Sequence, residues 1–209
     1  MIKQLKNVAR ALAVLICAAL SHAETMTGVV YSKEAGNGAH PSGSIALAIG
    51  GTIHDMIWTP DLEDPRMPGC EDIGAIWTVE TSGSPSFPDV TRVTCKGVDK
   101  DAHDAWLLVR AFLEGLPNSV ATSPLLSFRY RTAPEFQRFV EQSKDFERSV
   151  LRSLIQIVSL DHSGRARLES FRGIDIRGKP RKSVFFTFEL VRNQRTTKWE
   201  IDGIETEVR

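Results

Sequence analysis

The stretch TAPEFQRFVEQSKDFERSVLRSLI, Thr132–Ile155, decides the fold that the sequence predicts. Thr132 and Glu135 have the spacing of a capping box, in which each side chain accepts a hydrogen bond from the other residue's backbone amide. Pro134 suits the first turn of a helix, because no partner is needed there for the N–H that proline lacks. Apolar residues then recur at steps of three and four from Phe136 onward, so they share one face. We expect a long amphipathic helix that is stable only against a partner surface.

The residues after this helix have the pattern of strands that supply such a surface. The expected strands are Ile155–Leu160, Arg165–Ile176, Val184–Val191 and Thr197–Val208. Glycine in a strand often marks a bulge, so Gly173 and Asp202-Gly203 are candidate bulges. The predicted fold class is therefore α+β, a helix packed on a curved antiparallel sheet.

Residues 1–23 have the pattern of a secretory signal peptide. Lys3, Lys6 and Arg10 precede the apolar segment Ala11–Leu20, and Ser21-His22-Ala23 is a small-x-small cleavage site. The apolar segment is shorter than the roughly 20 residues that a membrane span needs. We expect export to the periplasm or outside the cell, and no transmembrane segment in the mature chain; an uncleaved N-terminal anchor is the alternative.

The mature chain keeps two cysteines, Cys70 and Cys95. In an oxidising compartment an even pair predicts one disulfide. A metal site needs more ligands than this pair offers. We therefore expect a structural disulfide, no metal and no cofactor.

Two regions are expected in the mature chain. Residues 24–98 read as about five short strands with turn residues between them, which fits a small β-rich sheet or partly closed barrel. Residues 99–209 form the α+β part, beginning with a helix over Asp99–Gly115 that Asp101 caps. Residues 24–115 carry 6 basic and 14 acidic residues, and residues 116–209 carry 17 basic and 12 acidic ones. This change in charge supports the division.

The C-terminal part also has a resemblance to a known family. Its order of elements, ending in the strand Lys198-Trp199-Glu200-Ile201-Asp202-Gly203-Ile204, resembles the nuclear transport factor 2-like (cystatin-like α+β) superfamily. The resemblance covers about 99–209 and implies a cone-shaped cavity that binds small ligands, performs isomerase or dehydratase chemistry, or contacts proteins; the fold alone does not choose among these.

Candidate acid/base residues, if the chain is an enzyme, are His103, Asp104 and Tyr130. A carboxylate beside His103 could hold its imidazole for proton transfer. The structural interpretation is a solvated first helical turn, which needs only capping to explain Asp and His there. Because the predicted cavity strands lack an Asp–His or Tyr–Asp pair, we expect no catalytic residues.

The densest basic feature is the predicted hairpin tip with Arg177, Lys179, Arg181 and Lys182. It could attract an anionic surface, or it could protect an edge strand from aggregation. We expect the partner to be an unknown protein or envelope component, and nucleic acid is not an expected partner.

Two functions follow from these observations. The first is an exported, non-enzymatic binding or protein-interaction module of the bacterial envelope. The alternative is a small isomerase, dehydratase or hydrolase that uses the cavity. Nucleotide loops, zincin motifs, nucleophile elbows and dinucleotide fingerprints are absent from the sequence.

Overall fold

The computed structural model describes residues 23–34, 42–62, 69–115, 124–143, 154–161, 164–174 and 182–208. The predicted signal peptide therefore lies, apart from Ala23, outside the described residues. Within those ranges the chain forms nine strands, three α-helices and one 3-10 helix, η1 (Pro60–Leu62). In this part of the chain no helix has both the length and the apolar character that crossing a membrane requires.

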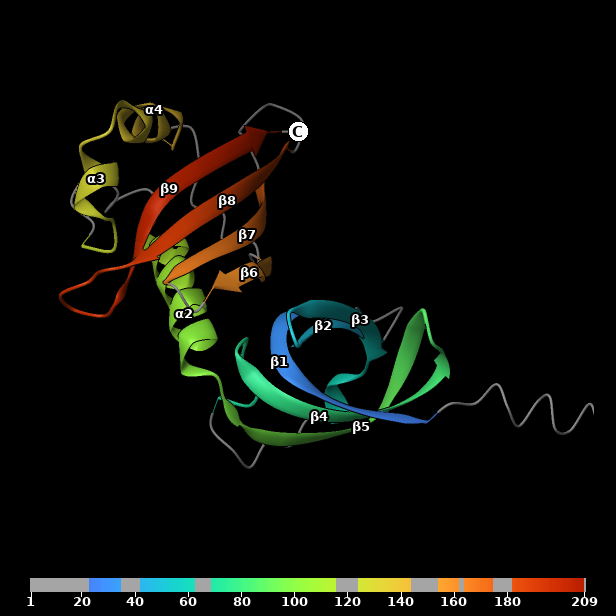
Figure 1. Cartoon of the computed structure of the whole chain (residues 1–209). Coiled ribbons are helices and arrows are strands. Elements are labelled where there is room, and N and C mark those ends of the chain that lie inside the picture. Colours follow the sequence, from blue (N-terminus) through green and yellow to red (C-terminus); the bar gives the residue numbers. More distant parts are fainter. Residues whose placement is uncertain are drawn as a thin grey trace, which may run out of the picture.

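The first five strands close into a barrel (Figure 1). They are β1 (Glu24–Glu34), β2 (Gly43–Ile49), β3 (Thr52–Trp58), β4 (Ala75–Ser84) and β5 (Phe87–Val98). The order around the barrel is β1-β2-β3-β5-β4, and β1 closes it by pairing with both β2 and β4. All pairings are antiparallel except that of β3 with β5. Gly50 and Gly51 make the tight β2–β3 turn, in which φ is 56° and 86° and a side chain would be strained.

The barrel core contains two tryptophans in contact and a disulfide beside them. Trp58 and Trp77 meet edge to face, with their ring centroids 6.0 Å apart. The indole N–H of Trp77 donates to the carbonyl of Cys70 at 3.0 Å. Cys70 and Cys95 are bonded, with a Cα–Cα distance of 6.0 Å. The predicted disulfide is confirmed.

Helix α2 (Lys100–Gly115) runs from the barrel to the second sheet (Figure 1). The Asp99 carboxylate accepts hydrogen bonds from the amides of Asp101 and Ala102 at 3.0 and 3.1 Å. Asp99 is thus the capping residue, and the assignment of that role to Asp101 is wrong. The helix itself is confirmed.

The second sheet is an antiparallel meander in the order β6-β7-β8-β9. Its strands are β6 (Leu154–Asp161), β7 (Arg165–Ile174), β8 (Lys182–Arg192) and β9 (Trp199–Val208). Glu189 pairs with Gly203 and Leu190 with Ile201, so Asp202 is an extra residue and the bulge predicted there is confirmed. The pairing of β7 with β8 continues without a shift through Gly173, so the bulge predicted at that glycine is wrong.

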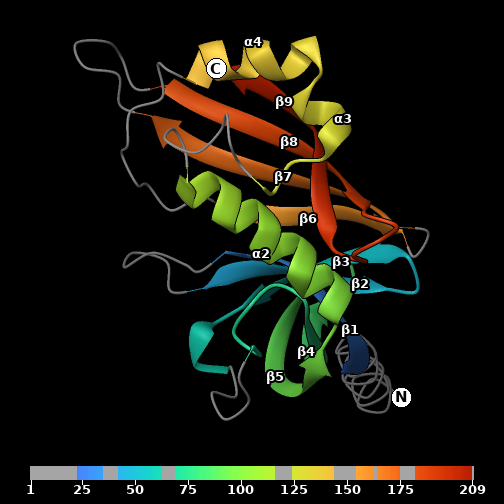
Figure 2. The same cartoon turned by 90° about the vertical axis from the view of Figure 1, so that its left-hand side faces the viewer.

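Two helices lie against one face of this sheet (Figure 2), and aromatic side chains join them to it. Phe112 of α2 lies 5.9 Å from Phe188, and Phe139 of α4 (Pro134–Ser143) lies 6.5 Å from Phe186, between ring centroids. Phe186 and Phe188 are two residues apart on β8 and therefore point to the same side. The buried side chains of barrel, helices and sheet form one continuous cluster.

A short helix, α3 (Phe128–Arg131), is held against the bulge in β9. The Asp202 carboxylate accepts a hydrogen bond from the Ser127 hydroxyl at 2.6 Å and a pair of bonds from the Arg129 guanidinium. Burial raises the pKa of Asp202, but the hydrogen bonds from Arg129 and Ser127 outweigh it, so the pKa lies below its ordinary value. The bulge therefore orients this carboxylate towards α3.

The predicted fold class, α+β with a long helix on the sheet, is wrong. Strands account for most of the described residues and form two separate sheets, one of them a closed barrel. Helix α4 ends at Ser143 in its described part, and Leu154 and Ile155, assigned to the helix from their spacing, lie in β6. The resemblance to the nuclear transport factor 2-like superfamily stays a prediction without support from this arrangement, and so does the division at residues 98 and 99.

Candidate functional site

Between β3 and β5 a single residue pair closes the barrel, which leaves a gap in the backbone pairing of these two strands. The β3–β5 register holds one pair, Ile57 with Asp89. By contrast, β3 pairs with β2 along its whole length, from Thr52 to Trp58. A hollow of about 440 Å³ lies beside this gap. Its size is within the range of roughly 300–1,000 Å³ that small-ligand pockets have.

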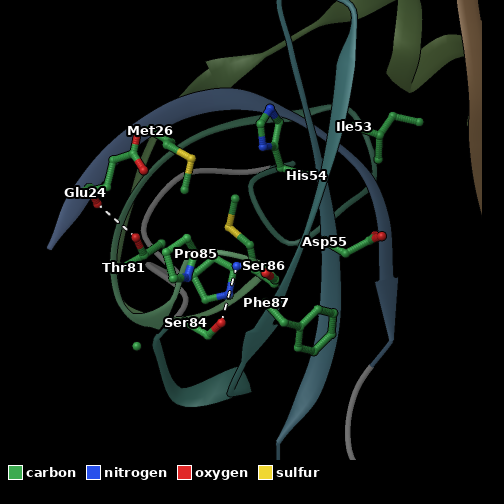
Figure 3. A pocket seen from close by; sticks show the side chains of 13 residues that line it. Glu24, Met26, Ile53, His54, Asp55, Thr81, Ser84, Pro85, Ser86 and Phe87 are labelled. Atoms are coloured by element: carbon green, nitrogen blue, oxygen red, sulfur yellow. Dashed lines mark hydrogen bonds between the residues drawn. The ribbon is translucent and has the colours of Figure 1, made fainter. Parts of the chain in front are cut away.

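We call this hollow the β3–β5 pocket. Its lining residues come from the start of β1, the first part of β3, the end of β4 and the β4–β5 turn. They are Glu24, Met26, residues 53–56, Thr81 and residues 83–88 (Figure 3). Three separate segments of the barrel therefore build one site.

The pocket is lined by polar and apolar residues, and two of its apolar side chains are exposed. Ile53 is 43% exposed and Phe87 is 45% exposed, whereas Met56 is fully buried. Figure 3 shows Ile53 and Asp55 on one side of β3 and His54 on the other, as the alternation of a strand requires. A ligand that covers exposed apolar side chains such as these removes apolar surface from water, which is favourable.

The charge of the pocket is acidic. Glu24 and Asp55 contribute carboxylates, and the described lining residues include neither lysine nor arginine. The Thr81 hydroxyl donates to the backbone carbonyl of Glu24 at 3.2 Å, which fixes the start of β1 against β4. A site of this kind favours an apolar ligand that is neutral or positively charged.

A tight turn places Phe87 at the pocket. Strand β4 ends at Ser84, β5 begins at Phe87, and these two residues pair with each other. The Ser84 hydroxyl accepts a hydrogen bond from the amide of Ser86 at 3.4 Å. Pro85 suits the turn because its φ is fixed and it needs no hydrogen-bond partner for its nitrogen.

The three predicted acid/base residues do not meet at a site. The His103 Nδ1 atom lies 3.0 Å from the carbonyl oxygen of Ile73, and Asp104 forms an ion pair with Lys100. Neither residue, nor Tyr130, is among the described residues that line the β3–β5 pocket. His103 and Asp104 therefore have structural partners at the start of α2.

Tyr130 is buried under α4. Its hydroxyl donates to the carbonyl of Ile204 at 3.5 Å, and its ring centroid lies 5.5 Å from that of Phe136. Burial raises the pKa of Tyr130 to about 12. The phenol is thus a poor proton donor or acceptor near neutral pH.

The predicted basic hairpin tip falls largely outside the described residues. Arg177, Lys179 and Arg181 lie there, and of Lys182 the structure gives the backbone, which pairs with Ile174. The binding role predicted for these four residues stays a prediction. In the described ranges no three His, Cys, Asp or Glu side chains gather in a way that could hold a metal ion.

A second hollow, of about 490 Å³, lies on the sheet face opposite to the helices. Its carboxylates are Glu34 from the end of β1, Glu169 and Glu207, and its apolar side chains include Leu154 and Phe185. It is wider open than the first and lacks strongly exposed apolar side chains, so we treat the β3–β5 pocket as the candidate site.

Sequence reasoning missed this pocket. Residues 24–98 were expected to form short strands with turns between them, and no function was expected for Ile53 or Phe87. The sequence does contain a signal. Apart from Phe87, the stretch Ser82–Pro88 consists of Ser, Gly and Pro, and a turn of that composition has no local structural use for an aromatic residue.

The barrel topology defines a fold class. A closed five-stranded barrel in the order β1-β2-β3-β5-β4, with β3 and β5 parallel, is the arrangement of the oligonucleotide/oligosaccharide-binding (OB) fold. Folds of this class carry many unrelated functions. The second sheet and its helices are additions to that barrel.

Comparisons with known proteins add little to this. No family model matches the chain, and no curated protein matches it. Among solved structures, one described as the Ifi202 HINa domain in complex with 20-bp dsDNA is 8% identical, with a TM-score of 0.30, over 90% of this chain and 97% of that one. Another, described as "Molecular basis for abrogation of activation of pro-inflammatory cytokines", is 11% identical, with a TM-score of 0.28, over 90% and 94%. A third, "Structural mimicry for functional antagonism", is 10% identical, with a TM-score of 0.30, over 91% and 94%. Similarity this low carries no argument about site or function.

One expectation about partners needs correction. The prediction that nucleic acid is not a partner is contradicted, because it was made without the closed barrel that the structure shows. The barrel belongs to a fold class that includes oligonucleotide-binding proteins.

Proposed function

We propose that this chain is an exported, non-enzymatic binding module whose β3–β5 pocket takes an apolar ligand. The observation that carries the proposal is the pair of exposed apolar side chains, Ile53 and Phe87, beside a hollow of about 440 Å³. Solvation of such side chains is unfavourable, and a ligand that covers them gains that free energy.

The test is a fluorescence titration of residues 24–209 with Nile red, a neutral apolar dye. We expect saturable binding, and we expect the combined change Ile53→Ser and Phe87→Ser to weaken it at least about tenfold, which corresponds to about 1.4 kcal/mol. Both side chains are exposed, so the variant should fold.

A matched control uses one apolar side chain of similar exposure and one that is more exposed, both remote in sequence from the pocket. Leu107 is 40% exposed and Phe128 is 75% exposed. Changing both to Ser should leave the dissociation constant unchanged. Equal weakening in the two double variants would contradict the proposed site, because the dye would then be binding to exposed apolar surface in general.

Export is tested separately. Support for it comes from the sequence pattern of residues 1–23 and from the Cys70–Cys95 disulfide, which is typical of oxidising compartments. The full chain expressed in a Gram-negative bacterium should be recovered by osmotic shock with Glu24 as its first residue, as read by N-terminal sequencing. Recovery only from the cytosol, starting at Met1, would overturn this part.

A further inference from the structure

The edge of β3 that faces β5 is open along most of its length. Beyond the single pair of Ile57 with Asp89, β3 has no strand partner on that side in the part of the chain that the structure describes. An edge strand presents backbone N–H and C=O groups that another chain can pair with. This edge borders the β3–β5 pocket, which Ile53–Met56 line.

We infer that the occupant of the β3–β5 pocket is an extended, basic polypeptide segment that adds a strand to the open edge of β3. This inference rests on the proposed binding function and names its ligand class. Strand addition is an established way for an exposed edge to bind a peptide, with affinity from backbone hydrogen bonds and specificity from alternate side chains.

The dimensions fit a short segment. Strands rise about 3.3 Å per residue, so the edge from Ile53 to Met56 spans about 10 Å and pairs with three or four residues of a ligand. Alternate side chains of such a segment point to opposite sides. On one side they would meet Ile53 and Phe87, and on the other they would meet the side of β3 that carries His54 (Figure 3).

The charge of the barrel selects a basic segment. Glu24 and Asp55 line the pocket, and no lysine or arginine is among its described lining residues. Residues 24–98 as a whole carry 10 acidic and 4 basic side chains. Complementary charge of this kind favours lysine or arginine in the ligand and raises its association rate.

The experiment is isothermal titration calorimetry of residues 24–209 with capped hexapeptides. The probe alternates valine and lysine, and a second peptide alternates valine and glutamate. Two further versions of the lysine peptide carry N-methyl groups on alternate residues. One version blocks the amides on one edge of the extended peptide, and the other version blocks the amides on the opposite edge. Both lose backbone donors but keep every side chain. An oligonucleotide of eight thymidines completes the set.

We expect the lysine peptide to bind, the glutamate peptide to bind at least about fivefold more weakly, and at least one N-methylated version to bind at least about tenfold more weakly. Asp55→Asn should weaken the lysine peptide about two- to fivefold, as for an exposed ion pair. Asp61→Asn makes the same change of charge at an exposed residue outside the pocket lining and should have no effect.

Each other outcome overturns something specific. If both N-methylated versions bind as tightly as the unmodified lysine peptide, strand addition is ruled out. If the glutamate peptide binds as tightly as the lysine peptide, charge selection is ruled out. Nile red binding without peptide binding would overturn the inference and leave the proposed function standing, whereas loss of both would overturn the two together. Tighter binding of the oligonucleotide would replace the polypeptide with a nucleic acid as the occupant.

Discussion

The Cys70–Cys95 disulfide should account for a large part of the stability of residues 24–209. Its two cysteines are 25 residues apart. Closing a loop of that length removes about 12 cal/mol/K of entropy from the unfolded chain, which is about 3.5 kcal/mol at 25 °C. Domains have net stabilities of about 5–15 kcal/mol, so loss of the bond would remove a substantial share.

The assay is urea denaturation of residues 24–209, oxidised and after reduction with a thiol reagent. Cys17 lies in the predicted signal peptide, so Cys70 and Cys95 are the only cysteines in this chain, and reduction acts on one bond without removing an atom. Trp77, whose indole bonds to the Cys70 carbonyl, contributes to the fluorescence signal. We expect the free energy of unfolding to fall by about 3–4 kcal/mol and the melting temperature by about 7–14 °C.

The double variant Cys70→Ala, Cys95→Ala separates the cross-link from packing. Both side chains are buried, at 3% and 8% exposure. Truncation should therefore cost more than reduction, because the sulfur atoms are lost as well as the bond. A loss of less than about 1 kcal/mol on reduction would refute the loop-entropy reasoning, since the unfolded chain would then be restrained without the bond.

Two further predictions concern α2 and Tyr130. Gly74 has φ of 92°, and a Cβ there would lie 2.6 Å from the His103 backbone nitrogen, so Gly74→Ala should cost about 2–5 kcal/mol in urea denaturation. Gly50→Ala, at φ of 56° with open space around it, should cost only about 1–2 kcal/mol, and equal costs would contradict the proposed close packing of α2 on Gly74. Because burial raises the pKa of Tyr130 to about 12, the folded state favours the neutral phenol. The contribution of Tyr130 to stability should be constant well below pH 10, fall by about 2.3 kcal/mol as the pH rises to 12, and fall by up to about 2.7 kcal/mol above that pH. Tyr130→Phe should remove most of this fall in urea midpoints measured from pH 9 to 12, leaving a smaller slope from Tyr31, whose pKa burial also raises; an unchanged fall would contradict the assignment.

Features set by neighbouring residues could be predicted from the sequence. The helix over Asp99–Gly115, the bulge at Asp202-Gly203 and the disulfide each depend on short-range patterns, and the structure confirms them. The cap of α2 was displaced by two residues, since Asp99 and Asp101 both suit that position by residue type.

Features that depend on distant pairings could not be predicted. Barrel closure requires β1 to pair with β2 along one edge and with β4 along the other. The local sequence pattern of β1 does not indicate which strands it pairs with. The end of α4 was misplaced because Leu154 and Ile155 fit the helical period and also begin a strand pattern. The β3–β5 pocket joins Glu24, Ile53 and Phe87, which only the closed barrel brings together.

The position of α3 beside β9 has a consequence for the order in which the protein can be made. The Ser127 amide donates to the Ile201 carbonyl at 2.8 Å, and the Ile201 amide donates to the Leu125 carbonyl at 2.9 Å. The Ser127 hydroxyl donates to Asp202, which lies 75 residues later in the chain. At about 5–20 residues per second, a ribosome that has added Ser127 needs roughly 4–15 s more to add Asp202. All five barrel strands have been synthesised well before then, whereas Leu126, 1% exposed in the finished protein, stays uncovered until the last strand arrives. The half of the chain that contains the pocket is complete early in translation, whereas the other half is complete only once β9 has been synthesised.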